Sequence, residues 1–308
     1  MAATAQSLVA LGFAQVLAVL FLGPLFEGFV RKYIRAQIAH SRRGPLVGIW
    51  QPFVDLGKLF VKEDVEVGGG LQRLAPILCL GGTLCAATLV PMAGIAPLGT
   101  GGDFIVFVYV LGIGAVAMVL GGLASISPYA YAGATREMML FLIVEPVLVI
   151  ALVTAAVSSH SLAFADMVLW YRTNGVTLAM ALAGLAFLVA TLAQFGKLPF
   201  DIPEAEQEIM GGPFIEMSGP KLALFKWAIW ARQFVVASLF VSVFAPWPHV
   251  ASIPLAMAIT VLKTLFVFIL IGLVDVVNPR LRVDQALAFY LGVIILAAMS
   301  VALAIVTV

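Results

Sequence analysis

Long uninterrupted runs of apolar residues dominate the hydropathy pattern of the chain. Each run approaches the length of about 20 residues that a helix needs to cross the hydrocarbon core of a bilayer. Backbone groups in lipid must be paired within the structure, so such runs predict helices, whereas a β-barrel would show short alternating segments. We predict an all-α polytopic membrane protein, one integral membrane domain over 1–308, with about eight transmembrane helices at 6–30, 73–93, 104–125, 137–158, 177–196, 222–244, 252–275 and 285–307.

Composition agrees with this class. The 308 residues are 63% hydrophobic and 11% charged, whereas soluble domains carry about 25% charged residues. A net charge of +1 indicates no bulk attraction to nucleic acid. Cys79 and Cys85 lie in one apolar run and match no metal-binding spacing, and an iron–sulfur cluster needs about four thiolates. We therefore expect neither a metal nor a cofactor on this chain.

The distribution of Lys and Arg predicts the orientation. The odd-numbered loops, 31–72, 126–136, 197–221 and 276–284, hold nearly all of these residues, and the opposite loops hold only Arg172. We therefore expect the odd-numbered loops to face the cytoplasm and both termini to lie outside the cytoplasmic (inner) membrane. The cations on the predicted cytoplasmic side, with span edges included, are Arg31, Lys32, Arg35, Arg42, Arg43, Lys58, Lys62, Arg73, Arg136, Lys197, Lys221, Arg280 and Arg282.

The first cytoplasmic loop, 31–72, mixes basic and apolar residues. Within 50–62 the apolar residues follow helical spacing, which predicts an amphipathic helix after the first span. Two interpretations remain open and are compatible: an interfacial helix with Lys58 and Lys62 toward lipid headgroups, or a platform that docks a partner protein. The apolar positions of this helix are Phe53, Leu56, Leu59 and Phe60.

The third cytoplasmic loop, 197–221, is acidic. It begins within the stretch "GKLPFDIPEAEQE" (196–208), which follows an uncharged apolar span. Large apolar residues surround its carboxylates, which favours a loop buried under a partner or folded back into the bundle. If the segment is helical, Glu204 and Glu208 share one face and repel each other, which raises carboxylate pKa values. The four acids of this stretch are Asp201, Glu204, Glu206 and Glu208.

Charged residues also occur inside the predicted spans, where each costs about 2.5–3.5 kcal/mol and is a functional candidate. Glu27, Glu137 and Asp275 lie near span ends, where their side chains can reach the interface. Three deeper residues fit either a polar file that relays protons or structural pairs between helices; they are Glu145, Arg232 and Lys263.

Three motifs occur in order on the predicted cytoplasmic side: "RRGPLVGIWQPFVDLGKLFVKED" (42–64), "GATREMMLFLIVEP" (133–146) and "GKLPFDIPEAEQEIMGGPFIEMSG" (196–219). Through them, most of the chain resembles the membrane subunit that joins the peripheral arm to the pump arm. This subunit occurs in respiratory complex I, as subunit 1, and in the group 4 membrane-bound nickel–iron hydrogenases of the formate hydrogenlyase and energy-converting types.

Details of the motifs favour the hydrogenase branch. Complex I subunits typically have Arg where this chain has Lys197, "EYSG" where it has "EMSG" (216–219), and a "SYE"-like stretch where it has Ile143 and Val144 before Glu145. The "QP…D..KL..KE" pattern of the first loop also occurs in complex I.

The resemblance implies a membrane-anchoring and coupling subunit without a catalytic centre of its own. Its partners would be the hydrogenase large and small subunits, which hold the nickel–iron site, together with iron–sulfur subunits and an antiporter-like membrane subunit. Partner docking would involve Arg42, Arg43, Lys58, Lys62 and Glu216. The proton path or coupling residues would be Glu137, Glu145, Asp201, Glu204, Glu206, Glu208, Arg136, Lys226, Arg232 and Lys263.

Three other functions are compatible with parts of the sequence. The chain could be the quinone-site subunit of complex I or a purely structural membrane anchor. A secondary transporter working alone would be expected to show an internal repeat, and we find none. The sequence leaves open the electron donor (ferredoxin, formate or carbon monoxide), the choice between proton and sodium, and whether this chain conducts ions.

Overall fold

The computed structural model describes residues 5–35, 48–65, 69–92, 94–248, 250 and 252–307, and this part of the chain is helical without a β-strand. The predicted all-α fold is confirmed. The elements in chain order are α1 (Ala5–Val30), η1 (Arg31–Arg35), α3 (Gln51–Val61), α4 (Gly70–Leu89), α5 (Asp103–Leu123), α6 (Pro128–Ser159), α7 (Phe164–Asn174), α8 (Leu178–Gln194), α9 (Glu206–Ile209), η2 (Gly212–Phe214), α10 (Gly219–Phe244), α11 (Ile253–Val277) and α12 (Val283–Thr307).

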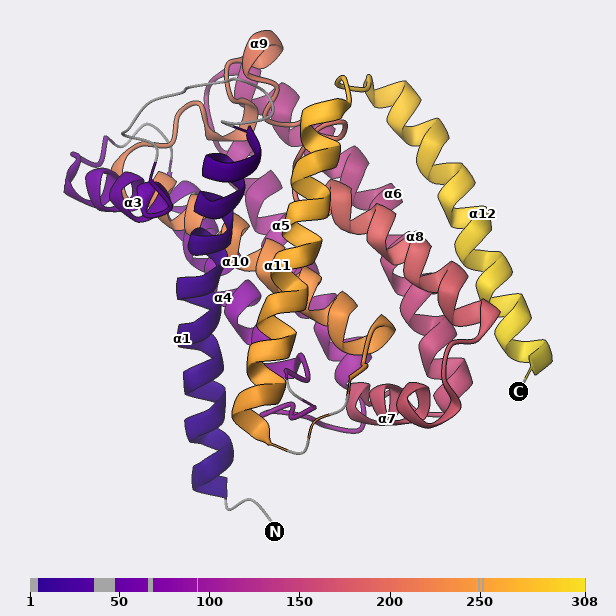
Figure 1. The fold of residues 1–308 in the computed structure, drawn as a ribbon. Coiled ribbons are helices and arrows are strands. Elements are labelled where there is room, and N and C mark those ends of the chain that lie inside the picture. The colour runs from indigo at the N-terminus through magenta and orange to yellow at the C-terminus, as the bar shows by residue number, and fades with distance from the viewer. Residues whose placement is uncertain are drawn as a thin grey trace.

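Each of the eight predicted spans coincides with a helix. Within the described residues, 7 helices are long and apolar enough to cross a membrane, namely α1 with η1, α4, α5, α6, α10, α11 and α12. The eighth, α8, has 17 residues, which at about 1.5 Å per residue rises roughly 26 Å. The start of α1 and the end of α12 lie at the same end of the molecule, and α9 lies at the opposite end (Figure 1).

Two helix boundaries differ from the prediction. Helix α6 begins at Pro128 rather than near 137, so Arg136 is a helical residue and not a loop residue, and Glu137 lies inside the helix rather than at its start. Pro128 occupies the first turn, where its missing N–H costs nothing. Helix α7 (Phe164–Asn174) lies in a segment that we predicted as a loop. Its 11 residues mix polar and apolar types and are too few to span a bilayer, and it lies flat across the lower end of the bundle in Figure 1.

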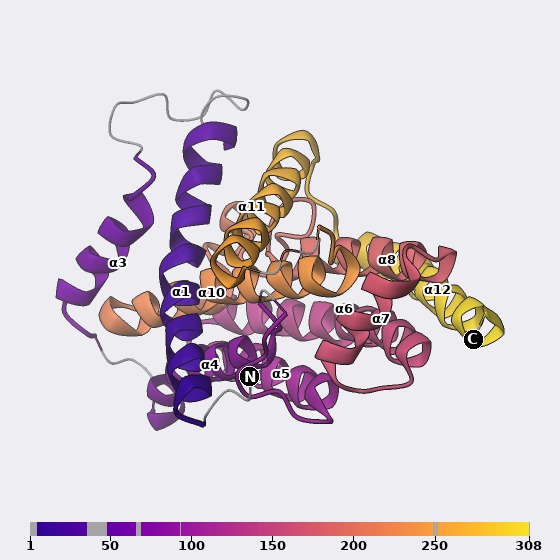
Figure 2. The ribbon, with the colours of Figure 1, turned by 60° about the horizontal axis from the view of Figure 1, so that its bottom comes forward.

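Helix α10 forms the centre of the bundle. Of its most apolar window, 83% is buried, against 28% in both α11 and α12. It packs against α1, α4, α8 and α11, and Figure 2 shows it running across the molecule between these helices. The outer helices therefore present large apolar surfaces, as lipid-facing helices do, while α10 is enclosed.

Helix α3 lies on the flank of the bundle beside α1 and α10 (Figure 2). Its Leu56 is buried against Ala223 and Trp230 of α10, whereas Lys58 and Lys62 are exposed. The predicted helix after the first span is therefore present, with one apolar side against the bundle and cations away from it. Its position on the cytoplasmic side stays a prediction.

The crossing of α1 over α10 depends on a glycine. A Cβ atom on Gly23 would lie 2.6 Å from the backbone oxygen of Trp230. Small residues at such crossings allow helix backbones in a membrane to approach closely. Any larger residue at this position must push the two helices apart, because the opposing atom belongs to the backbone.

We predict that Gly23→Ala lowers the free energy of unfolding by about 1–3 kcal/mol, the usual range for overpacking a tight contact. Thermal unfolding of the purified protein in detergent, followed by tryptophan fluorescence, measures the change. Gly292→Ala is the matched control, because a Cβ atom there meets nothing within 4 Å. A Gly23→Ala variant as stable as Gly292→Ala would show that the helices do not depend on this contact.

Candidate functional site

A cavity of ≈ 610 Å³ lies at the predicted cytoplasmic end of the bundle. Its walls come from the end of α1, η1, the acidic loop, α10 and the segment that follows α11. Charged side chains dominate the lining. They are Glu27, Arg31, Arg35, Lys197, Asp201, Glu204, Glu208, Lys226 and Arg280.

Glu27 and Lys197 form a buried ion pair beside this cavity. The Nζ atom of Lys197 donates to both carboxylate oxygens of Glu27, at 2.8 and 2.9 Å. The Nε atom of Arg31 also donates to Glu27, at 2.9 Å. Glu27 is only 1% exposed, so its side chain does not reach toward the interface as its place near the helix end suggested. Burial of this carboxylate is offset by two cations, and the pair fixes the start of the acidic loop to α1.

Asp275 makes a second attachment to the same loop. It is buried near the end of α11, and it accepts a 2.6 Å hydrogen bond from Nε of Arg35. Its other oxygen accepts the backbone N–H of Leu198 at 3.0 Å. Asp275 is therefore buried and paired, and it does not reach the interface as its place near the span end suggested. Two consecutive residues at the start of the acidic loop, Lys197 and Leu198, are thus held by carboxylates from transmembrane helices.

Asp201 faces the cavity from the acidic loop. Its carboxylate accepts a 2.9 Å hydrogen bond from Nη2 of Arg280. Burial raises the pKa of Asp201, and the positive charge of Arg280 opposes that shift. The loop after α11 therefore supplies the counter-charge that keeps a partly buried acid at this position.

Glu204 and Glu208 do not share a helix face. Helix α9 covers only Glu206–Ile209, so Glu204 precedes it and lines the cavity. Glu204 is accessible to water there, but the surrounding protein crowds its carboxylate. This burial, together with the negative charge of Asp201, raises the pKa of Glu204 to about 7.

Glu208 is held differently. Its carboxylate accepts a 2.7 Å hydrogen bond from Nη1 of Arg136, and this bond lowers the pKa of Glu208. The expected repulsion between Glu204 and Glu208 is therefore wrong, and the acids that act on Glu204 are Asp201 and, more weakly, Glu137.

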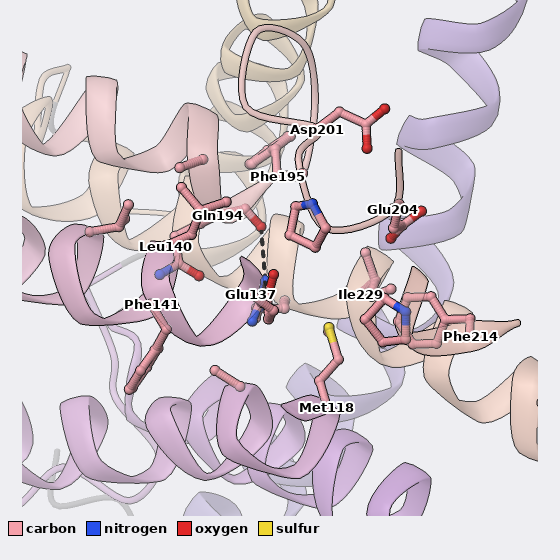
Figure 3. A pocket seen from close by; sticks show the side chains of 17 residues that line it. Met118, Glu137, Leu140, Phe141, Gln194, Phe195, Asp201, Glu204, Phe214 and Ile229 are labelled. Carbon is pink, nitrogen blue, oxygen red and sulfur yellow. Dashed lines mark hydrogen bonds and ion pairs between the residues drawn. The ribbon is translucent and has the colours of Figure 1, made fainter. Parts of the chain in front are cut away.

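A smaller cavity of ≈ 40 Å³ adjoins the large one and reaches into the bundle. Asp201 and Glu204 line both cavities, and Figure 3 shows them on the loop beyond Glu137. At its inner wall, Glu137 of α6 lies 4.0 Å from Arg232 of α10. Arg232 also donates to the backbone oxygen of Gln194 at 3.3 Å. The smaller cavity, whose wall is mostly apolar, thus has carboxylates of the acidic loop in one part of its lining and a buried ion pair between transmembrane helices in another.

Two of the predicted relay residues lie elsewhere. Glu145 borders a separate, mostly apolar groove of ≈ 420 Å³ formed by α4, α5 and α6. Lys263 borders a pocket at the other end of the molecule and donates to the backbone oxygen of Ala245 at 2.6 Å. The structure therefore separates Lys263 from the other two residues, whereas Glu145 borders a different groove but lies within electrostatic range of Arg232.

The predicted docking residues have different environments. Lys58 and Lys62 are exposed. Glu216 accepts the backbone N–H of Ile126 at 2.7 Å, so it ties the acidic loop to the start of the α5–α6 connection. Arg42 and Arg43 lie outside the described residues. Glu206 begins α9, and its side chain also lies outside the described part.

Sequence reasoning missed several residues of the charged cavity. Lys197, Arg35 and Arg280 were predicted only as cytoplasmic cations, and Glu27 and Asp275 only as span-end acids. One signal in the sequence could have indicated them, because both acidic and basic residues occur near the same ends of the apolar runs. Such complementary charges at neighbouring helix ends predict pairing, although not the identity of the pairs.

The arrangement can hold water and exchange protons between carboxylates of different pKa. Among the described residues, no group of three or more His, Cys, Asp or Glu side chains could hold a metal ion. The charged lining gives the site acid–base and electrostatic capacity.

Comparisons with known proteins agree with this fold. The profile of the family described as NADH dehydrogenase matches residues 10–308. The chain is 38% identical over 279 residues to hydrogenase-4 component C of Escherichia coli (strain K12), covering 87% of each protein. It is 35% identical to formate hydrogenlyase subunit 4 of the same organism, over 88% of this chain and 90% of that protein.

Two further matches extend to other complexes. A subunit of the NADH-quinone oxidoreductase of Geobacillus kaustophilus (strain HTA426) is 31% identical, over 91% of this chain and 86% of that protein. A solved structure of the membrane-bound sulfane sulfur reductase, an archaeal respiratory membrane complex, contains a similar chain. It superposes with a TM-score of 0.87 and 27% identity, covering 96% of this chain and 99% of that one.

Helical fold, charged cavity and relatives together define a multi-pass membrane subunit of an oxidoreductase complex. The chain belongs to the NADH dehydrogenase subunit family. The predicted resemblance to hydrogenase membrane subunits and to complex I is confirmed by these matches.

The Glu27–Lys197 pair yields a stability prediction. Lys197→Met leaves a buried carboxylate with Arg31 alone, so we expect a loss of about 3 kcal/mol, the lower end for breaking a buried pair. The double variant Glu27→Gln with Lys197→Met removes the orphaned charge and regains part of that loss. Denaturant unfolding in detergent measures both.

Lys226→Met is the control for this cycle, because Lys226 lines the same cavity but is exposed. We expect it to change stability by less than about 0.5 kcal/mol. If the effects of Glu27→Gln and Lys197→Met simply add, the two residues are not coupled and the pair does not hold the loop.

Proposed function

We propose that this chain is the membrane-anchoring and coupling subunit of a membrane-bound nickel–iron hydrogenase complex. The observation that supports this proposal most is that two neighbouring cavities share Asp201 and Glu204 in their walls, and that the smaller one reaches the Glu137–Arg232 pair inside the bundle. The acidic loop would lie on the cytoplasmic side of the inner membrane, beneath a peripheral arm that carries electrons to a hydrogen-forming site. The chain would link that electron transfer to translocation of protons or sodium.

The physical basis of coupling is that the protonation state of Glu204 depends on the charges near it. Its pKa of about 7 arises from burial and from the charge of Asp201. A carboxylate that titrates near neutral pH changes its protonation when a nearby charge changes. A change of charge on a redox centre in a partner above the loop would therefore change the protonation of Glu204. Proton movement along the cavities would carry this change toward Glu137 and Arg232.

The cofactors of this activity would lie in partner subunits. An iron–sulfur chain and a nickel–iron site supply the electron transfer and proton reduction in that scheme. This chain contributes an anchoring surface, through the acidic loop and the exposed Lys58 and Lys62 of the α3 segment, and it contributes a charged path. An antiporter-like membrane subunit would receive the coupled signal.

A second candidate is the quinone-site subunit of a complex I, favoured by the relative from an NADH-quinone oxidoreductase. A third is a structural anchor, in which the buried charges serve only to pair helices. The first two differ in the metals and activity of the assembled complex. The third differs in what happens when the cavity acids are neutralised.

Purification of the tagged chain in mild detergent, with metal analysis and a hydrogen-evolution assay, separates the complexes. We expect nickel, iron and hydrogen evolution to copurify with the chain. Iron and flavin with quinone reduction, and no nickel, would assign it to complex I instead.

In the assembled complex, we predict that Glu204→Gln and Glu137→Gln lower ion translocation per hydrogen formed by about a hundredfold or more, the typical loss when a positioned acid–base group is removed. Hydrogen formation with an artificial donor should continue, because the redox centres are untouched. Acidification of vesicles that contain the complex gives the readout.

Asp284→Asn is the matched control, because Asp284 is exposed at the start of α12 and does not line either cavity. If the cavity variants assemble, form hydrogen and translocate ions as well as Asp284→Asn does, the chain is an anchor and the coupling role is excluded.

A further inference from the structure

A small pocket lies at the end of the molecule opposite the acidic loop. It has a volume of ≈ 30 Å³ and is enclosed by the segment after α4, α7, the end of α10 and α11. Helix α7, which forms one wall, lies flat at this end of the bundle (Figure 1). The pocket has no part in the charged cavity described above.

Two cations border this pocket. Arg172 of α7 and Lys263 of α11 both line it, and the described lining residues include no acid. Arg172 is also the only Lys or Arg of the predicted outer loops. The other loop cations lie on the predicted cytoplasmic side, so a cation here is an exception to that distribution. Burial lowers the pKa of Arg172. The pocket is therefore a concentration of positive charge without a described counter-ion.

Two residues that line this pocket carry unpaired donors. The hydroxyl of Ser242 is buried with no hydrogen-bond partner among the described residues, and Ser242 as a whole is 8% exposed. The Nε atom of Arg172 is likewise buried and without a partner in that part of the chain. Buried donors normally have a partner, so two such orphans in one pocket call for an acceptor from outside the chain.

A purely structural explanation accounts for only one of these groups. Lys263 donates to the backbone oxygen of Ala245, just after α10, as cations often do at helix C-termini. That contact does not satisfy Arg172 or Ser242. The guanidinium of Arg172 lies against Gly94, where a Cβ atom would be 3.4 Å from Nη2. The glycine therefore lets the guanidinium lie close to the backbone at the edge of the pocket.

The size and chemistry of the pocket select the acceptor. A space of ≈ 30 Å³ exceeds the roughly 10–15 Å³ that one water needs, so it admits the oxygens of one small anionic group at its mouth. Arg is suited to bidentate contacts with phosphate, and Lys adds a point charge. We propose that Arg172, Lys263 and Ser242 bind one phosphate group, taken from the headgroup of an anionic phospholipid or from free phosphate.

The test uses the full chain, purified and delipidated in detergent. It is reconstituted into nanodiscs of phosphatidylcholine with a minor share of phosphatidylglycerol, and retained lipid is counted by native mass spectrometry. In parallel, equilibrium dialysis measures binding of radiolabelled inorganic phosphate in detergent. We expect saturable binding of one phosphate-bearing ligand in one of the two assays, and a loss of roughly tenfold or more in affinity for Arg172→Gln, because a charge-assisted hydrogen bond is removed.

Ser242→Ala is a second variant that removes one donor with little change of shape, so the test survives a folding defect in Arg172→Gln. Arg282→Gln is the matched control, since Arg282 is an exposed cation at the opposite end of the bundle. Retention of phosphatidylglycerol that Arg172→Gln or Ser242→Ala weakens, and Arg282→Gln does not, identifies a lipid headgroup. The same pattern with phosphate alone identifies free phosphate. Equal binding by all variants in both assays overturns the proposal.

Discussion

The burial of charge in a bundle made almost wholly of apolar helices is the constraint on which this structure depends. A buried carboxylate is tolerated only where cations and hydrogen bonds offset its lost hydration. Glu27 meets this condition through Lys197 and Arg31, and Asp275 through Arg35 and the backbone of Leu198. These contacts attach the acidic loop to α1 and α11. The loop is consequently an integral wall of the bundle.

That attachment explains how one end of the protein can respond to charge. The loop holds Glu204 and Asp201 over a water-accessible cavity, and a narrower cavity continues from them to Glu137 and Arg232. The acids of the loop have different environments. The hydrogen bond from Arg136 lowers the pKa of Glu208 and so favours its ionised form. The pKa of Glu204, in contrast, is about 7, which is close to neutral pH. The arrangement favours a relay in which Glu204 is the responsive group.

Much of the fold could be predicted from the sequence because apolar runs of membrane length have few alternatives. The helix of residues 51–61 was also predictable, since its apolar positions repeat at helical spacing. Helix α7 and the true start of α6 were not, because both contain mixed polar and apolar residues that suit a loop equally well. In these segments, packing against the bundle decides the conformation.

The candidate site was predicted less completely, for a physical reason. Sequence identifies which residues are charged near helix ends, but which acid meets which base depends on how distant helices cross. Glu27 and Lys197 are 170 positions apart, and no local pattern joins them. Depth within a span was also misleading: Lys263 and Arg232 are both deep in their helices, yet they border pockets at opposite ends of the molecule.

The most direct test of this account is redox-triggered infrared difference spectroscopy of the assembled complex near pH 7. The carboxyl C=O band of Glu204 should change when the partner redox centres are reduced, and it should be missing from Glu204→Gln but present in Asp284→Asn. The pH midpoint of this band should lie near 7, since burial and Asp201 raise the pKa of Glu204. A difference spectrum that is the same in all three proteins would contradict the claim that the acidic loop senses electron transfer.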